Sequence, residues 1–250
     1  MAGFVRPTAD RWIRKTVLIA LAVVTGAAPA GAQARVLHPG DALFIGVGGL
    51  HMATGALDDR LTANGYPTFG RLAGTVGGGA YRAWRNRLLL GGEANLLVIG
   101  EKPHRGSEVA LQGGFATLGI GYVVHPSSRL RLYPRVGSGA GGLVLTIARD
   151  GEEVGFDEVL DEPFRPSRSE ADRLTVLTND GLVLDLGGGA ELLPRAGRLL
   201  IGARAGYLAT RFGPQWHLDE RFEKRLVRDG PDATIAGLYL RVVVGVRRRR

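Results

Sequence analysis

Apolar and polar residues alternate along most of this chain, a pattern that predicts β-strands. Alternate residues of a strand face opposite sides, and we call the two alternating sets of positions its two parities. In the segment LVLDLGGGAELL, Asp185 and Glu191 share one parity, and the other parity carries only leucine, glycine and alanine. Each alternating segment is about ten residues or longer, the length that a tilted strand needs to cross a bilayer. Eight such segments are predicted, at 42–53, 70–84, 87–98, 108–124, 129–147, 181–193, 198–210 and 234–246.

The connections between these segments alternate in length. Short turns are predicted at 85–87, 125–128 and 194–197. Long loops are predicted at 54–69, 99–107, 148–180 and 211–233. Transmembrane barrels alternate in this way, with tight periplasmic turns and longer external loops. The predicted fold class is therefore all-β, a closed antiparallel up-and-down transmembrane β-barrel of about eight strands.

Two segments admit a second interpretation. The residues Asn179-Asp180-Gly181 are typical of a hairpin turn, which would raise the count to ten strands. One long strand is preferred because it preserves the alternation of the loops. The stretch HLDERFEKRLV is the one place where the spacing is compatible with a helix, because Leu218, Phe222 and Leu226 recur every four residues.

The first 34 residues have the organisation of a secretory signal peptide. Its parts follow in order, with the bases Arg6, Arg11, Arg14 and Lys15, the uncharged run at 16–30, and AQA at 32–34. The apolar run is shorter than the roughly 20 residues of a membrane helix, so an uncleaved anchor is the less favoured alternative. The predicted domains are a cleavable signal peptide at 1–34 and an outer-membrane β-barrel at 35–250.

Composition narrows the class of partner. The chain has no cysteine and a net charge of +8. The signal peptide carries +3 of that charge, which leaves +5 on the mature chain. The basic residues are dispersed along the chain, which argues against a nucleic-acid partner. The moderate excess of positive charge is compatible with binding to anionic lipid headgroups.

Charged residues in the strands fall on the parity opposite to the branched aliphatic residues. In a membrane barrel the aliphatic parity faces lipid and the charged parity faces the lumen. The sequence therefore predicts a lumen charge network of Glu93, Arg131, Arg135, Asp185, Glu191, Arg204 and Arg241. Asp185 and Glu191 are expected to pair first with Arg204 on the next strand, and then with Arg131, Arg135 and Arg241, since an unpaired charge in a low-dielectric interior is costly. An interfacial aromatic girdle is expected from Tyr81, Trp84, Tyr122 and Tyr207.

Three stretches and the AQA signal carry a family resemblance, namely YPRVGSGAGG, LDLGGGAELLPRAGRLLIGARAGY and AGLYLRVVVGV. On these, the chain resembles the small bacterial outer-membrane β-barrel proteins of the outer membrane protein A, X and W type. The resemblance implies eight strands and insertion by the barrel-assembly machinery. It also implies roles ranging from structural support to adhesion and passage of small hydrophobic molecules. Such barrels usually end on an aromatic residue, whereas here the last strand ends at Val246 and four arginines follow.

The function predicted is that of a non-enzymatic outer-membrane barrel with a structural or surface-interaction role in the Gram-negative cell envelope. The expected partners are outer-membrane lipids and lipopolysaccharide, the protein is expected to be a monomer, and no cofactor, metal ligand or catalytic residue is predicted. The alternatives are a narrow, porin-like passive pore, a lipid-modifying enzyme, and a soluble periplasmic lipocalin-like binder.

The enzyme alternative depends on the stretch HRGSE. His104 and Ser107 are three residues apart, which on a strand places them on opposite faces and separates a base from a nucleophile, unless the segment is a loop. Glu108 is the third residue of this stretch that the enzyme alternative would need. The acidic loop at 150–162 lacks the ligand spacing of a calcium loop and is expected to be solvated.

Overall fold

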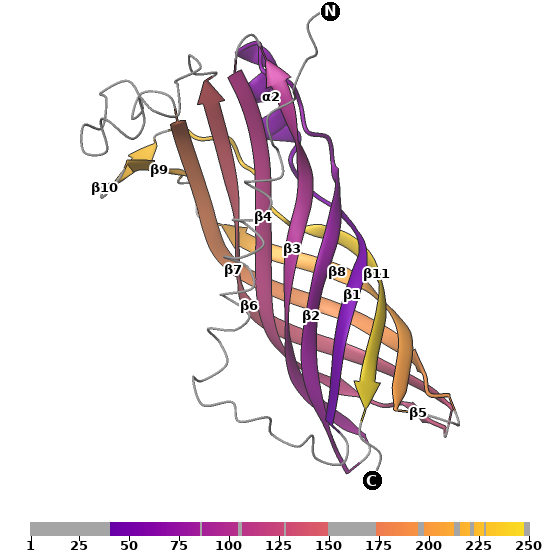
Figure 1. The fold of residues 1–250 in the computed structure, drawn as a ribbon. Coiled ribbons are helices and arrows are strands. Elements are labelled where there is room, and N and C mark those ends of the chain that lie inside the picture. The colour runs from indigo at the N-terminus through magenta and orange to yellow at the C-terminus, as the bar shows by residue number, and fades with distance from the viewer. Residues whose placement is uncertain are drawn as a thin grey trace, which may run out of the picture. The chain divides into compact units, whose positions relative to one another are not determined.

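Eight strands of the computed structural model form an up-and-down barrel (Figure 1). The structure describes residues 41–85, 87–104, 107–127, 129–149, 174–194, 198–212, 216–220, 223–227 and 229–247, so the predicted signal peptide lies outside the described residues. The barrel strands are β1 (Asp41–His51), β2 (Leu72–Trp84), β3 (Leu88–His104), β4 (Ser107–Tyr122), β6 (Leu130–Arg149), β7 (Leu174–Leu192), β8 (Leu199–Phe212) and β11 (Gly237–Arg247).

The barrel closes between its first and last strands. Each barrel strand pairs in antiparallel register with the next, and β11 returns to β1 from Ala42 opposite Arg247 to Leu50 opposite Tyr239. Every barrel strand therefore has a hydrogen-bonded neighbour on both sides. The predicted closed antiparallel barrel of eight strands is confirmed.

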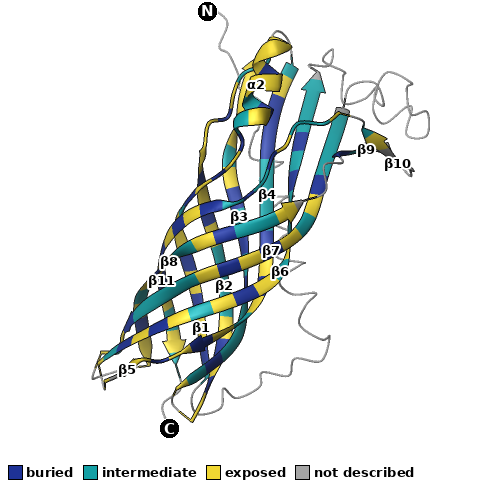
Figure 2. Ribbon diagram, turned by 180° about the vertical axis from the view of Figure 1, so that it is seen from behind, coloured by how far each residue is buried: buried dark blue, intermediate teal, exposed yellow. Residues whose placement is uncertain are grey.

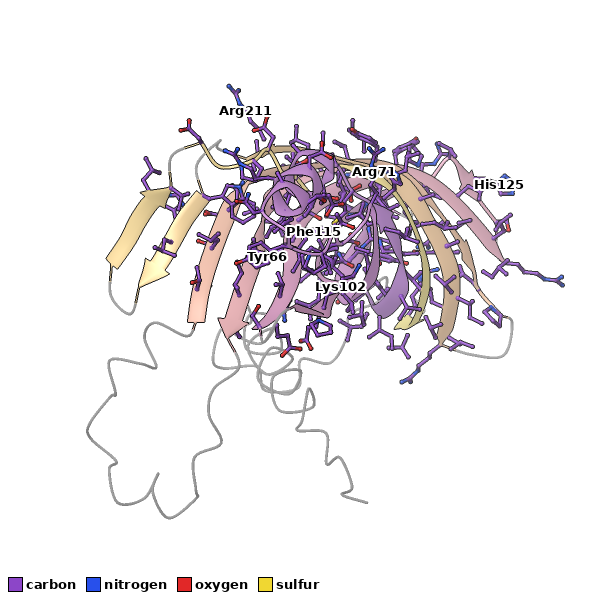
Figure 3. All side chains as sticks on the ribbon, turned by 90° about the horizontal axis from the view of Figure 1, so that it is seen from above. Tyr66, Arg71, Lys102, Phe115, His125 and Arg211 are labelled. Carbon is purple, nitrogen blue, oxygen red and sulfur yellow. The ribbon has the colours of Figure 1, made fainter. Side chains whose placement is uncertain are left out.

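The two ends of the barrel carry different elements. At one end, here called the long-loop end, lie the helix α2 (Gly55–Ala63) and the strands β9 (Trp216–Glu220) and β10 (Glu223–Val227). At the other, the short-turn end, lie the connections after β2 and β7 and the two-residue strand β5 (His125–Pro126). Seen from above, α2 lies over the interior of the barrel, and Arg211 points away from it (Figure 3). Among the described residues, no helix is long and apolar enough to span a membrane.

The possible helix in the stretch HLDERFEKRLV, suggested by its apolar spacing, is wrong. That stretch forms the β9–β10 hairpin, in which His217 pairs with Leu226. β9 also pairs with β7, at Leu177 opposite Leu218 and Thr178 opposite His217. The extended end of β7 offers backbone groups for pairing, and this pairing outweighs a short helical period.

The α2 helix was not predicted from the sequence. Its two buried residues, Leu57 and Leu61, give too short an apolar stripe to stand out as a period. A carboxylate holds the returning chain against the helix, because Asp58 accepts hydrogen bonds from the backbone N–H groups of Phe69 at 2.8 Å and Gly70 at 3.1 Å. The helix depends on this tertiary contact more than on its own pattern.

Two further expectations concern strand ends. β7 runs through Asn179-Asp180-Gly181 without a turn and pairs there with β6, so one long strand is confirmed and the ten-strand alternative is wrong. The long loop expected at 99–107 is also wrong. β3 and β4 remain paired up to His104 opposite Ser107, after a register shift between Val98 and Gly100.

Burial follows strand parity around the barrel (Figure 2). Large apolar side chains that are exposed occur on all eight barrel strands, and Leu186, for example, is 53 % exposed. We call this outward-facing surface the aliphatic belt; it includes Leu43, Ile45, Val76, Val98, Leu118, Ile120, Val136, Leu184, Leu186, Ile201, Leu240 and Val242. Of the residues expected in the aromatic girdle, Trp84, Tyr122 and Tyr207 are exposed on this surface, but Tyr81 is buried inside.

Gly237, the first residue of β11, provides a test of how closely the backbone of β11 approaches that of β1. Its φ is +155°, and an added Cβ would overlap the carbonyl oxygen of His51. We expect Gly237→Ala to lower the free energy of unfolding in detergent micelles by at least about 2 kcal/mol, through backbone strain and this overlap. Gly49→Ala is the control, because its added Cβ would meet nothing nearer than 3.7 Å. Equal urea midpoints for the two variants would contradict the close approach of β11 to β1.

Candidate functional site

The seven predicted lumen residues all lie inside the barrel, at inward positions of β3, β6, β7, β8 and β11. Asp185 and Glu191 are fully buried, and even the side chain of Arg135 is only 9 % exposed. The structure brings these residues into ion-pair contact with one another. They are the candidate site, because they are the densest set of polar groups in the described interior.

Glu93 is the centre of the set. Its Oε2 atom accepts hydrogen bonds from Nη1 of Arg135 at 2.7 Å and from Nη1 of Arg204 at 2.8 Å. Its Oε1 atom accepts one from Nη2 of Arg241, also at 2.8 Å. Arg241 donates a second bond, from Nη1 to Oδ1 of Asn95, at 2.6 Å. One carboxylate on β3 thus joins guanidinium groups from three other strands.

Glu191 is held chiefly by tyrosines. Tyr81 donates to its Oε2 atom at 2.6 Å, and Tyr133 donates to its Oε1 atom at 2.8 Å. The guanidinium groups of Arg131 and Arg204 lie further off, at 3.7 and 3.6 Å. The two phenols satisfy a carboxylate that is fully removed from solvent, which offsets part of its desolvation cost.

Among the arginines expected as partners of Asp185, the favoured one, Arg204, is wrong, and Arg135 is the one that pairs with it. Asp185 Oδ2 lies 3.0 Å from Nη2 of Arg135 instead, and its Oδ1 accepts a hydrogen bond from Tyr239 at 2.7 Å. The backbone register places Asp185 opposite Leu208 on β8, with Arg204 opposite Gly189 four residues closer to the short-turn end. Arg204 therefore reaches Glu93 and Glu191. Arg135, on the neighbouring strand β6, lies opposite Gly187, two residues from Asp185.

Tyr81, Tyr133, Tyr239 and Asn95 were not predicted as members of the site. The sequence could have indicated three of them, because Asn95, Tyr133 and Tyr239 share the parity of neighbouring charged residues and should therefore face the lumen. Tyr81 had none, because its position near a strand end is equally typical of an interfacial aromatic residue. A phenol that donates to a buried carboxylate cannot be told from one at a membrane surface by spacing alone.

The interior around these polar residues is filled by two apolar clusters. The long-loop cluster contains Leu50, Met52, Leu57, Leu61, Phe115, Leu143, Val183, Leu208, Trp216 and Ile235, among others. The short-turn cluster contains Ala42, Phe44, Tyr81, Ala83, Leu89, Val123, Tyr133, Leu200 and Val243. The guanidinium of Arg204 stacks over Phe44 at 3.8 Å, and that of Arg241 lies 5.8 Å from the ring of Phe115. The polar residues are therefore bounded by packed apolar side chains toward both ends.

This arrangement can hold the barrel together but leaves little room for a ligand. The cavity beside Glu93 and Arg135 has a volume of about 40 Å³, which has room for a few water molecules. The two carboxylate oxygens of Glu93 are both occupied by guanidinium groups. No acid or base of the set is presented to an open cleft where it would meet a substrate.

The HRGSE stretch has a different geometry from the one expected. His104 ends β3 and Ser107 begins β4, where the two residues pair, so they do not share one strand and the separation expected for a strand does not apply. Glu108 pairs with Pro103 and is exposed on the other face of the hairpin. The acidic loop at 150–162 lies outside the described residues, as do the last three arginines.

Comparison with known proteins gives structural matches only. The sequence matches no protein-family model and no curated protein. The fold is similar to that of Ail, the attachment invasion locus protein of Yersinia pestis, at 12 % identity and a TM-score of 0.43, over 84 % of this chain and 98 % of that one. It is also similar to a major outer membrane protein from Thermus thermophilus, at 11 % identity and a TM-score of 0.45, over 82 % and 98 %. Similarity at this level assigns no ligand, partner or activity to the chain.

The revised pairing of Asp185 can be tested by double-mutant cycles. We expect Asp185→Leu to lower the free energy of unfolding by about 3–5 kcal/mol, because it leaves buried Arg135 with one carboxylate partner fewer. The coupling energy between Asp185→Leu and Arg135→Leu should reach about 0.5–3 kcal/mol, the range for residues in contact. Asp185→Leu with Arg204→Leu is the control cycle and should show the smaller coupling. Urea unfolding in micelles measures the parent, the single variants and the double variants, and a larger coupling with Arg204 would favour the pairing expected from the sequence.

Proposed function

We propose that this chain is a non-conducting barrel of the bacterial outer membrane with a structural or surface-interaction role. The observation that carries the proposal is the combination of an aliphatic belt outside and a filled interior. A water-exposed surface of this kind would be far larger than the few hundred Å² of contiguous apolar surface on ordinary soluble proteins. In a hydrocarbon environment this apolar surface is not exposed to water, so it carries no hydration cost. A closed sheet also leaves no unpaired backbone edge in contact with lipid.

The same observation argues against the soluble-binder alternative. A lipocalin-like protein encloses a ligand cavity and turns a wetted face outward. Here the inward face is occupied by ion pairs and packed side chains, and the outward face is aliphatic. The polarity of the two faces is thus opposite to what that alternative requires.

A passive pore is the second candidate, and the filled lumen counts against it. Conduction requires a continuous aqueous path through the barrel. Apolar clusters lie toward both ends of the described interior, and the cavity beside Glu93 and Arg135, which borders the short-turn cluster, is small. We therefore favour a role in which the barrel anchors the elements at its long-loop end, α2 and the β9–β10 hairpin, at the cell surface.

Cell fractionation combined with bilayer recording tests the proposal. We expect the mature protein in the outer-membrane fraction, with a gel mobility that changes on heating as folded barrels unfold. Purified protein should give no steady conductance in a planar bilayer, since its lumen is filled. Recovery in the soluble periplasm would remove the membrane assignment, and a steady current would favour the pore.

A charge introduced into the belt tests its contact with lipid. Leu186 is 53 % exposed on β7, and Leu186→Asp would place a carboxylate on the belt. Folding into lipid vesicles should be destabilised by an amount that grows with depth in the bilayer, by up to about 2 kcal/mol for an acidic residue. Leu226→Asp is the matched control, because Leu226 is 50 % exposed but lies on β10, outside the barrel. Equal loss in the two variants, or none in either, would argue against a lipid-facing belt.

A further inference from the structure

The short-turn end of the barrel is strongly basic in its described residues. The described residues of this end include six exposed or partly exposed arginines and one acid outside the lumen, Asp41, whose carboxylate lies 2.7 Å from Nε of Arg82. We call these arginines the arginine rim: Arg82, Arg85, Arg87, Arg129, Arg198 and Arg247. They come from β2, from all three short connections or the strand ends beside them, and from the end of β11.

The long-loop end has the opposite balance. Among the residues at this end whose side chains the structure describes, acids outnumber bases, with Asp58, Asp59, Glu101, Glu108, Asp180, Asp229 and Asp232 against Arg60, Arg71, Lys102 and Arg211. The excess positive charge of the described barrel is therefore concentrated on one rim rather than spread over the surface. A rim of this kind attracts anions, and the acidic end does not.

One part of the arginine rim is built like a membrane interface. Trp84 pairs with Leu88, and Leu88 pairs with Tyr122, so the register sets two exposed aromatic residues on either side of a leucine across β2, β3 and β4. Arg87 donates a hydrogen bond from Nη1 to the hydroxyl of Tyr122 at 3.1 Å. Tryptophan and tyrosine prefer the headgroup level of a bilayer, between hydrocarbon and water.

Arg85 lies in the same turn with an unfavourable backbone. Its φ is +48°, in the left-handed region where glycine is the residue without steric cost. Both Arg85 and Arg87 are exposed, immediately beyond Trp84 at the edge of the aliphatic belt. We define Trp84, Arg85, Arg87 and Tyr122 as the turn site.

We propose that the turn site binds the headgroup of an anionic phospholipid in the leaflet at the short-turn end. The inference rests on the proposed membrane function and adds a partner to it. Guanidinium groups bind phosphate oxygens with paired, directional N–H donors, and a headgroup with net negative charge remains attractive at longer range. The aromatic residues then pack against the glycerol and upper acyl region. The occupant is a phospholipid, because the belt brings this turn to the headgroup level of a bilayer and not to open water.

Tryptophan quenching gives a direct readout of the lipid beside the site. The mature chain has two tryptophans, so Trp216→Phe leaves Trp84 as the sole emitter. This protein, reconstituted in phosphatidylcholine vesicles, is titrated with brominated phosphatidylglycerol or with brominated phosphatidylcholine. We expect half-maximal quenching at a several-fold lower mole fraction of the anionic lipid, with a difference that narrows as salt is raised. Inorganic phosphate at matched ionic strength should not displace the lipid.

Matched variants separate this site from general electrostatics. Arg85→Gln with Arg87→Gln should bring the two lipids close to equal quenching. Arg71→Gln with Arg211→Gln removes the same charge from the long-loop end, where both residues are exposed, and should leave the preference unchanged. Heat-modifiable mobility checks insertion of every variant. Inserted protein without lipid preference, or equal loss in both double variants, overturns the inference, whereas failure of the parent protein to insert counts against the proposed function instead.

Discussion

The backbone pairing of β1 with β11 is the constraint on which the rest of the molecule depends. It turns an open sheet into a ring, so that each residue of a barrel strand must face either the interior or the outside. Once the ring is closed, strand parity alone decides which side chains are buried. The aliphatic belt and the interior ion pairs are two consequences of the same closure, and neither would persist if β11 left β1.

Closure also explains why the interior charges are tolerated. An eight-stranded barrel is just wide enough for side chains to fill it, so long residues from opposite walls meet. Glu93 can contact guanidinium groups from three strands because the ring brings those strands around a common axis. The cost of burying these charges is large, and multiple contacts offset it where a single pair would not. Inward glycines contribute by leaving space, as at Gly139, where an added Cβ would overlap the carbonyl oxygen of Ala116.

Parity made much of the fold predictable from the sequence. The period of two along each strand identified the eight strands and the inward positions of all seven charged residues, since a one-residue error would have reversed a whole face. It could not identify which of them touch, because Asp185 has an arginine on each neighbouring strand, and the contact with Arg135 on β6 is set by the register of β6 against β7. The sequence favoured Arg204 on β8, the other neighbour, but that residue lies opposite Gly189 and not beside Asp185. Local patterns also failed at the long-loop end, where α2 and the β9–β10 hairpin are held by tertiary contacts with the returning chain and with β7.

The two ends of the barrel differ in the length of the connections between strands and in what those connections carry. Between the two ends, the aliphatic belt and the packed interior would fix the position of the chain in the bilayer that we propose for it. At the short-turn end the connections are tight, so the few residues there can serve the interface only through their own side chains, as Trp84 and Tyr122 illustrate. At the long-loop end the strands extend beyond the belt and support a helix and a hairpin, which together offer a folded surface. A filled barrel separates these two ends physically, so a role for one end need not involve the passage of anything to the other.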